Sequence, residues 1–109
     1  MSPTGQVVYY PPVAFNVPNA VSPDALKESV RRQVEYYFSA QNLSRDFFLR
    51  GKMDAEGWID LALVAGFNRV RMLTPDPAVI LEALAGSAVV ESARDGARLR
   101  PRDAPRQWV

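Results

Sequence analysis

Gln33, Tyr36 and Tyr37 are the first residues of the chain whose types and spacing could bind a ligand. Their spacing of i, i+3 and i+4 brings the three side chains within mutual reach on a helix. On a helical wheel of about 100° per residue, they line one flank of an apolar stripe that begins at Leu26. Buried hydroxyls and amides need hydrogen-bond partners. The cluster is therefore either an ordinary core or a pocket whose rings stack on flat ligands such as nucleobases.

Asp46, between Arg45 and Arg50, is a second candidate. A carboxylate in the first turn of a helix is favoured by the helix dipole, which would make its role structural. A carboxylate also accepts two hydrogen bonds side by side, which matches the 2′,3′-diol of a ribose at a free RNA end. The two arginines could contact RNA phosphates, although surface arginines are commonly only solvated.

The composition excludes several other kinds of site. The 109 residues contain neither Cys nor His, which excludes disulfides, Cys/His metal sites and Ser-His-Asp catalysis. We find no phosphate loop or carboxylate pair with metal-ligand spacing, so we expect neither an enzyme, a metal nor a cofactor. A net charge of +1 argues against a protein that binds nucleic acid mainly by neutralising many phosphates. No membrane span or signal peptide is recognisable, and we expect a cytoplasmic protein.

The elements that must position these residues begin at residues 22–24, where Ser, Pro and Asp predict a helix start. The apolar stripe runs on to Phe38, residues 41–43 are expected to break the helix, and Ser44 is expected to cap a second one. Its expected apolar residues are Phe47, Phe48 and Met53. A turn over 54–57 and a short strand over 58–60 follow.

Residues 61–73 predict two short helices joined at Gly66, and a further helix runs from an Asp76 cap to Gly86. Asp95-Gly96 lies between two β-like runs and predicts a hairpin. Together these elements indicate an α+β winged-helix domain over residues 23–109, with the hairpin as its wing. Residues 1–22 are uncharged and Pro-rich, and we interpret them as a linker, a packed arm or a peptide motif for a partner.

The segments QVEYYF (33–38) and NLSRDFF (42–48) resemble the La motif, and GWI (57–59), FNRV (67–70) and LT (73–74) keep that family's order over about residues 26–109. The resemblance implies an elaborated winged helix that captures RNA 3′ ends as a non-catalytic module. It implies that rings stack bases, that a Gln reads a base edge and that an Asp holds the ribose hydroxyls. The implied pocket residues are Gln33, Tyr36, Tyr37, Asp46, Phe48 and Phe67.

The run over 47–54 and the C-terminal tail are most similar to the La-related protein 1 group. That group implies poly(A) 3′ ends as the ligand, roles in mRNA stability and translation, and a link to poly(A)-binding protein through a full-length protein. We expect a monomer, and no RNA-recognition domain is recognisable beside the motif. The alternatives are oligo(U) 3′ ends, as for La itself, a protein-interaction domain, or a duplex-DNA reader that uses Asn68, Arg69 and Arg71.

The C-terminal stretch over 91–109 holds five arginines against three carboxylates. It is either a solubilising tail or a surface that steers the RNA backbone. Trp108 could dock this tail against the domain.

Overall fold

The structure is a computed structural model that describes residues 22–109. The arm expected over residues 1–22 therefore falls, apart from Ser22, outside the described range. The elements follow one another as α1 (Pro23–Tyr37), α2 (Ala40–Leu43), α3 (Phe47–Gly51), β1 (Ile59–Asp60), α4 (Leu61–Ala65), α5 (Asn68–Arg71), α6 (Pro77–Leu84), β2 (Val90–Ser92), β3 (Arg98–Pro101) and the 3-10 helix η2 (Pro105–Trp108).

Helix α1 begins and buries its apolar face as its sequence predicts. The Ser22 hydroxyl accepts a hydrogen bond from the Ala25 amide at 3.1 Å, which satisfies one of the free amides of the first turn. The stripe continues through Val30 and Val34, which are fully buried, to Phe38 at the C-cap. This stripe anchors α1 in the core and leaves its other faces for polar residues.

The expected break at residues 41–43 and the Ser44 cap are both wrong. Residues 40–43 form the separate short helix α2, because the Ser39 hydroxyl accepts the Asn42 amide at 3.2 Å and starts a new turn. Ser44 ends α2, and its hydroxyl donates to the Gln41 carbonyl. Asp46 caps α3 instead, with one carboxylate oxygen 2.9 Å from the Leu49 amide.

The apolar set expected for the second helix also needs correction. Phe47 is 72% exposed and Phe48 is 60% exposed, whereas Leu49 is fully buried and Met53 is buried. A helix of five residues can direct only one narrow face to the core, and in α3 Leu49 occupies it. Both phenylalanine rings are therefore left at the surface.

The remaining expectations for the chain order are confirmed. Helices α4 and α5 meet at Gly66, and Asp76 caps α6 by accepting the Ala78 amide. The sheet is antiparallel in the order β1–β3–β2, and Leu99 of the central strand is fully buried. Gly96 has a φ of +73° in the turn between β2 and β3, a conformation that favours glycine. The domain is an α+β winged helix of several short helices, a small sheet and a C-terminal hairpin.

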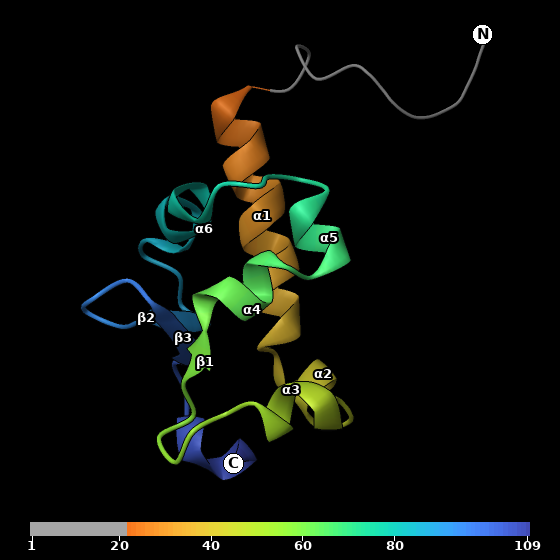
Figure 1. The fold of residues 1–109 in the computed structure, drawn as a ribbon, viewed down its shortest axis with the longest axis vertical. Helices are drawn as coiled ribbons and strands as arrows, with labels where there is room; N and C mark the ends of the chain where they lie inside the picture. The colour runs from red at the N-terminus through yellow and green to blue at the C-terminus, as the bar shows by residue number, and fades with distance from the viewer. Residues whose placement is uncertain (1–21) are drawn as a thin grey trace, which may run out of the picture.

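The shorter helices are arranged around α1, and two groups of elements lie near the C-terminal half of this helix. Helices α5 and α6 pack against α1 on either side, and α4 connects the sheet to α5 (Figure 1). Helices α2 and α3 lie beyond the C-terminal end of α1, together with the C-terminal η2 (Figure 1). The last turns of α1 therefore face both α5 and α3.

Candidate functional site

A cavity of about 460 Å³ opens between the second half of α1 and the start of α5. It is lined by Gln33, Tyr36, Tyr37, Asn68 and Arg69. The lining therefore combines two phenol rings with amide and guanidinium groups. Rings offer faces for stacking and the polar groups offer directed hydrogen bonds, so the cavity suits a flat ligand with polar edges.

Four aromatic rings from three separate segments continue along one side of this cavity. The ring centroids of Tyr37 and Phe67 are 5.1 Å apart in an edge-to-face arrangement, and those of Phe48 and Phe67 are 6.4 Å apart. Tyr36 and Tyr37 are 6.4 Å apart. These separations fall within the range of favourable aromatic pairs. The rings thus form one connected surface from α1 to α3.

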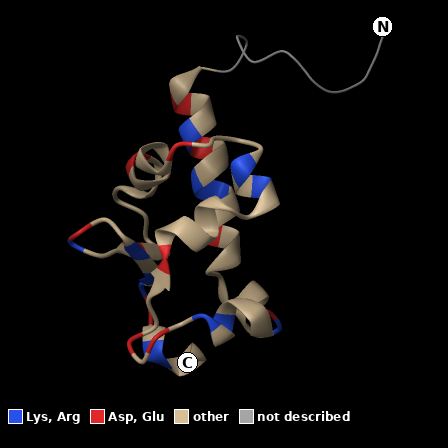
Figure 2. Ribbon diagram, viewed as in Figure 1, with Lys and Arg blue, Asp and Glu red and all other residues tan. Residues whose placement is uncertain are grey.

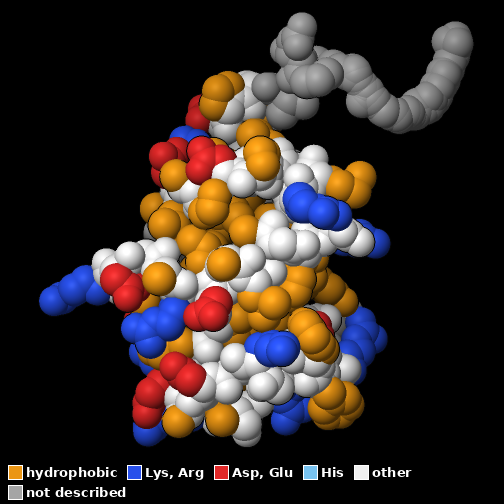
Figure 3. All heavy atoms as spheres, viewed as in Figure 1, with side chains coloured by type: hydrophobic (Ala, Val, Ile, Leu, Met, Phe, Trp, Pro, Cys, Tyr) orange, Lys and Arg blue, Asp and Glu red, His pale blue; other side chains and the backbone are white. Residues whose placement is uncertain are grey.

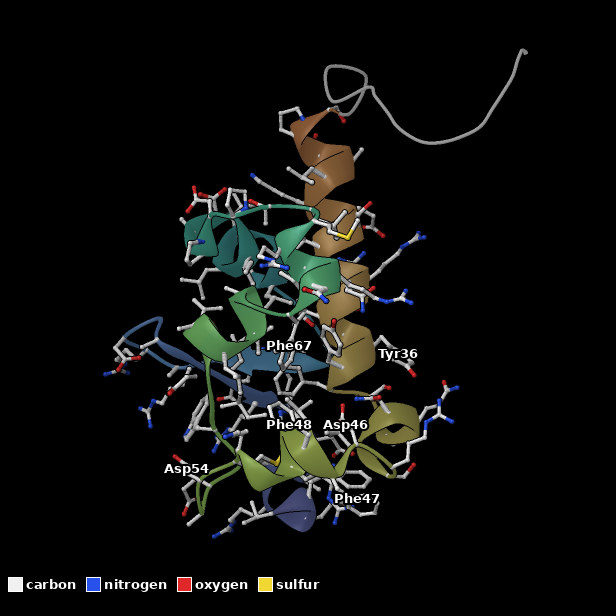
Figure 4. All side chains as sticks on the ribbon, turned by 45° about the vertical axis from the view of Figure 1, so that its right-hand side comes forward. Tyr36, Asp46, Phe47, Phe48, Asp54 and Phe67 are labelled. Carbon is white, nitrogen blue, oxygen red and sulfur yellow. The ribbon has the colours of Figure 1, made fainter. Side chains whose placement is uncertain are left out.

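The outer rings of this series are accessible to a ligand. Phe48 is 60% exposed and Tyr36 is 40% exposed, whereas Tyr37 and Phe67 pack partly against the core. In Figure 4, Phe48, Phe67 and Asp46 lie around the space between the end of α1 and α3, while Tyr36 extends on the other side of α1. We call the cavity, together with Asp46 and the rings of Phe48 and Phe67, the aromatic pocket. Apolar atoms gather on the face between α4 and α3 (Figure 3).

Two hydrogen bonds fix the carboxylate of Asp46 at the edge of the aromatic pocket. Its Oδ1 accepts the Leu49 amide at 2.9 Å, as expected for a helix cap. Its Oδ2 accepts Nδ2 of Asn42 at 3.0 Å. A carboxylate oxygen has two lone pairs, so each oxygen keeps one for a further donor. The structural and the functional interpretations of Asp46 are therefore compatible.

The Tyr37 hydroxyl remains neutral over the physiological range. Burial raises the pKa of the Tyr37 phenol, while hydrogen bonding with the Gln33 side chain and the positive charge of Arg69 lower the pKa by less. The negative charge of Asp46 adds to the rise in pKa. A neutral phenol and a neutral amide can both donate and accept, which is what recognition of a base edge requires.

Basic side chains surround the aromatic pocket. Nη2 of Arg45 donates to the Tyr36 hydroxyl at 3.2 Å, and Nζ of Lys52 lies 5.4 Å from the centre of the Phe48 ring. Within residues 22–109, neither these two cations nor Arg69 and Arg71 form an ion pair. Lys and Arg occur on α5 and near α3 in Figure 2, while α5 carries no acidic residue.

Arg50 is used differently from Arg45. Its Nε donates to the Trp108 carbonyl at 3.0 Å, and its guanidinium lies over the rings of Phe47 and Trp108. These contacts fasten η2 to α3, so Trp108 does dock the C-terminal tail. The Nε of Arg50 is already used as a donor to Trp108. A role for Arg50 in contacting phosphate stays a prediction.

The structure brings together all six residues expected to form a pocket, although it does not test their roles. Sequence reasoning from the helical wheel found Gln33, Tyr36 and Tyr37. It missed Asn68 and Arg69 as pocket residues, because they were weighed only as residues of a DNA-reading helix. Their position directly after Phe67 was the available signal. It also missed Asn42, which lay in a segment expected to be a simple helix break.

Residues 22–109 hold neither a candidate metal-binding cluster nor a candidate membrane-spanning helix. That part of the chain contains no group of three or more His, Cys, Asp or Glu that could hold a metal ion. None of its helices is both long and apolar enough to span a membrane.

Comparisons with known proteins agree on one family. The model of the La domain matches residues 30–86, a range that contains the whole aromatic pocket. The La RNA-binding domain-containing protein LHP1 of Cryptococcus neoformans var. grubii is 47% identical over 95 residues, which cover 85% of this chain and 10% of that protein. La-related protein 1C of Arabidopsis thaliana is 38% identical over 112 residues, which cover 95% of this chain and 21% of that protein.

A solved structure has the same fold. The La autoantigen N-terminal domain matches with a TM-score of 0.70 at 39% identity, over 76% of this chain and 91% of that one.

A third curated relative is La-related protein 1B of Arabidopsis thaliana, which is 52% identical over 66 residues, 61% of this chain and 15% of that protein. The chain thus spans between 10% and 21% of these three curated relatives, but nearly all of the solved domain.

Proposed function

The chain belongs to the La domain family, as its motifs predict, and on this premise we propose that it binds the 3′ end of single-stranded RNA. The ligand is an RNA with a free 3′ hydroxyl, with the poly(A) end of mRNA as the preferred target. The domain captures this end without catalysing a reaction. The name of the Cryptococcus relative describes an RNA-binding domain, which supports this class of ligand.

The arrangement of Asp46 carries the proposal. Each of its oxygens already accepts one hydrogen bond from the protein, so one acceptor position on each remains. Two neighbouring hydroxyls of a terminal ribose can donate to these two positions at once. A 3′ phosphate would remove one donor and bring a negative charge beside the carboxylate, which costs free energy. This geometry favours an unmodified RNA end over a phosphorylated one.

The rings supply binding energy that every base can use. Base stacking on an aromatic side chain contributes about 1–3 kcal/mol per base and depends little on sequence. Phe48 and Tyr36 are the accessible rings, while Tyr37 and Phe67 support them from the core side. Gln33 lies beside Tyr37 in the cavity lining, where its amide can read a base edge.

The cations around the aromatic pocket would contact the RNA backbone. Arg45, Lys52 and Arg69 form no ion pair within residues 22–109, so no such ion pair has to break when they contact a phosphate. Phosphate contacts of this kind hold the strand in place without reading its sequence. The preference for adenine over uracil comes from the resemblance to the La-related protein 1 group.

The wider role follows from the same resemblance. We place the domain in a cytoplasmic protein that acts on mRNA stability and translation, with the domain binding RNA as a monomer. Poly(A)-binding protein is a partner of such a protein through regions outside this domain.

The proposal can be tested by fluorescence anisotropy with labelled oligo(A), oligo(U) and a DNA duplex at equal ionic strength. We expect oligo(A) to bind most tightly and the duplex to bind weakly. A preference for oligo(U) would keep RNA binding and overturn the poly(A) assignment. A preference for the duplex would support the DNA-reading alternative, in which α5 enters the major groove.

A further inference from the structure

Asn42 is a buried polar residue that joins the two halves of the aromatic pocket. Its side chain is 8% exposed, and its single Nδ2 donates to two oxygens. One is the Tyr37 carbonyl at 2.8 Å, and the other is Oδ2 of Asp46 at 3.0 Å. The two protons of the amide group are therefore both used.

The two acceptors lie on different elements. Tyr37 is the last residue of α1, where carbonyls have no partner within the helix. Asp46 is the N-cap of α3, directly before the segment that carries Phe48. One side chain thus bridges the last residue of the helix that carries Gln33, Tyr36 and Tyr37 and the N-cap of α3.

The same hydrogen bond determines how Asp46 faces a ligand. The cap bond from the Leu49 amide holds one oxygen, but it leaves the carboxylate able to turn about that oxygen. The bond from Asn42 holds the second oxygen and fixes the plane of the group. A bidentate acceptor discriminates only while both of its oxygens point at the ligand.

We propose that Asn42 is a positioning residue, acting through Asp46, that sets how strongly the pocket distinguishes a free 3′ hydroxyl from a 3′ phosphate. This inference rests on the proposed function. Asn42 acts here without touching the RNA, because the residue is buried at 8% exposure and both of its donors are occupied within the protein.

The test is the ratio of dissociation constants for oligo(A) ending in a 3′ phosphate and in a 3′ hydroxyl. Asn42→Leu keeps the number and branching of the side-chain heavy atoms, replaces the amide by larger methyl groups and removes both donors. We expect the ratio to fall about tenfold, as the loss of a hydrogen bond to a charged group predicts. Thr74→Val is a matched control, since Thr74 is 4% exposed, its hydroxyl accepts a hydrogen bond from the Asp76 amide, and it does not line the cavity.

A double-mutant cycle separates action through Asp46 from general loosening. In the Asp46→Asn background, adding Asn42→Leu should leave the ratio nearly unchanged. An Asn42→Leu protein that discriminates like wild type overturns the inference. So does one that loses affinity for both ends equally, because that is the effect of a structural role.

A measurement on the wild-type chain covers the case in which Asn42→Leu does not fold. The side-chain amide resonances of Asn42 should shift in NMR spectra on addition of oligo(A) with a 3′ hydroxyl, and much less with a 3′ phosphate. Unchanged resonances, while those of pocket residues move, would overturn the inference. Wild-type protein that treats both ends alike would instead refute the proposed function on which it depends.

Discussion

Two neighbouring phenylalanines differ in where their rings point. Phe48 is 60% exposed and lies 6.4 Å from Phe67, whereas Phe47 is 72% exposed and its ring meets Arg50. Figure 4 shows Phe48 on the side of the pocket and Phe47 turned away from it. Because both side chains are largely exposed, replacing either one should change the stability of the fold little.

This pair gives a prediction with its own control. Phe48→Ala should weaken binding to oligo(A) by about 1–3 kcal/mol, the contribution of one stacked base. Phe47→Ala should bind close to wild type, because its ring does not face the pocket. Anisotropy titrations of the two variants, with their thermal midpoints, provide the comparison. Equal losses of affinity in both variants would show that the RNA does not bind on the Phe48 side of α3 as proposed.

Tyr37 gives a prediction for alkaline pH. Burial raises the pKa of this phenol above its ordinary value of 10.0, so the folded chain holds the proton more tightly than the unfolded chain does. The stability that this provides is complete below about pH 10 and is lost as pH rises through the raised pKa. Absorbance titration of wild type and Tyr37→Phe should reveal one phenol that ionises late. If the difference in absorbance between wild type and Tyr37→Phe instead titrates near pH 10, burial does not raise the pKa of Tyr37.

The residue types in the pocket were partly predictable from the sequence. Helical spacing brought Gln33, Tyr36 and Tyr37 together without any structure, because a wheel contains that information. Asp46 was recognised as a helix-start residue, but its bond to Asn42 depends on the short helix α2, whose start at Ser39 was missed. Phe67 was predicted as a pocket residue from the family pattern alone, because local periodicity does not reveal contacts between distant segments of the chain.

At the scale of elements, the caps and turns were the most predictable features. Ser22, Asp76 and the Asp95-Gly96 turn take the roles that their sequence indicates, because each acts within a few residues. The exposed rings of α3 were not predictable in this way. A helix too short to show a period cannot reveal which side faces the core, and tertiary packing decides it.

Gly57 tests how the turn after α3 is held against the C-terminal helix η2. Its φ is +88°, and a Cβ there would lie 2.6 Å from the Pro105 carbonyl oxygen. Gly57→Ala should therefore destabilise the domain by more than about 1–2 kcal/mol, the cost of the left-handed conformation alone. Gly51→Ala is the control, because nothing lies within 4 Å of a Cβ there and alanine favours the helix. Urea unfolding of both variants measures the difference, and similar midpoints would contradict it.

At the scale of the whole molecule, charge is nearly balanced and locally organised. The net charge is +1, and many of the arginines on α1 and on the sheet are paired with carboxylates. Arg45, Lys52 and Arg69, which form no ion pair within residues 22–109, lie beside the aromatic pocket. The domain therefore offers a few local phosphate contacts and no broad basic surface.

This charge distribution predicts a shallow dependence of binding on salt. Contacts to two or three phosphates of a single strand give a slope of about −1.4 to −2.1 in log K against log salt. Affinity for oligo(A) should thus fall about 7- to 20-fold between roughly 50 and 200 mM salt. Titrations over this range provide the slope. A fall of about a thousandfold would instead indicate a broad electrostatic interface.

The most direct test of the account is the affinity of the wild-type chain for one oligo(A) sequence with two different ends. The oligonucleotide carries either a 3′ hydroxyl or a 3′ phosphate, and anisotropy is measured at the same ionic strength. Because Asp46 keeps one acceptor position on each oxygen, we predict tight binding of the hydroxyl end and a loss of at least about tenfold for the phosphate end. Equal affinity for the two ends would contradict the capture of RNA 3′ ends by the aromatic pocket.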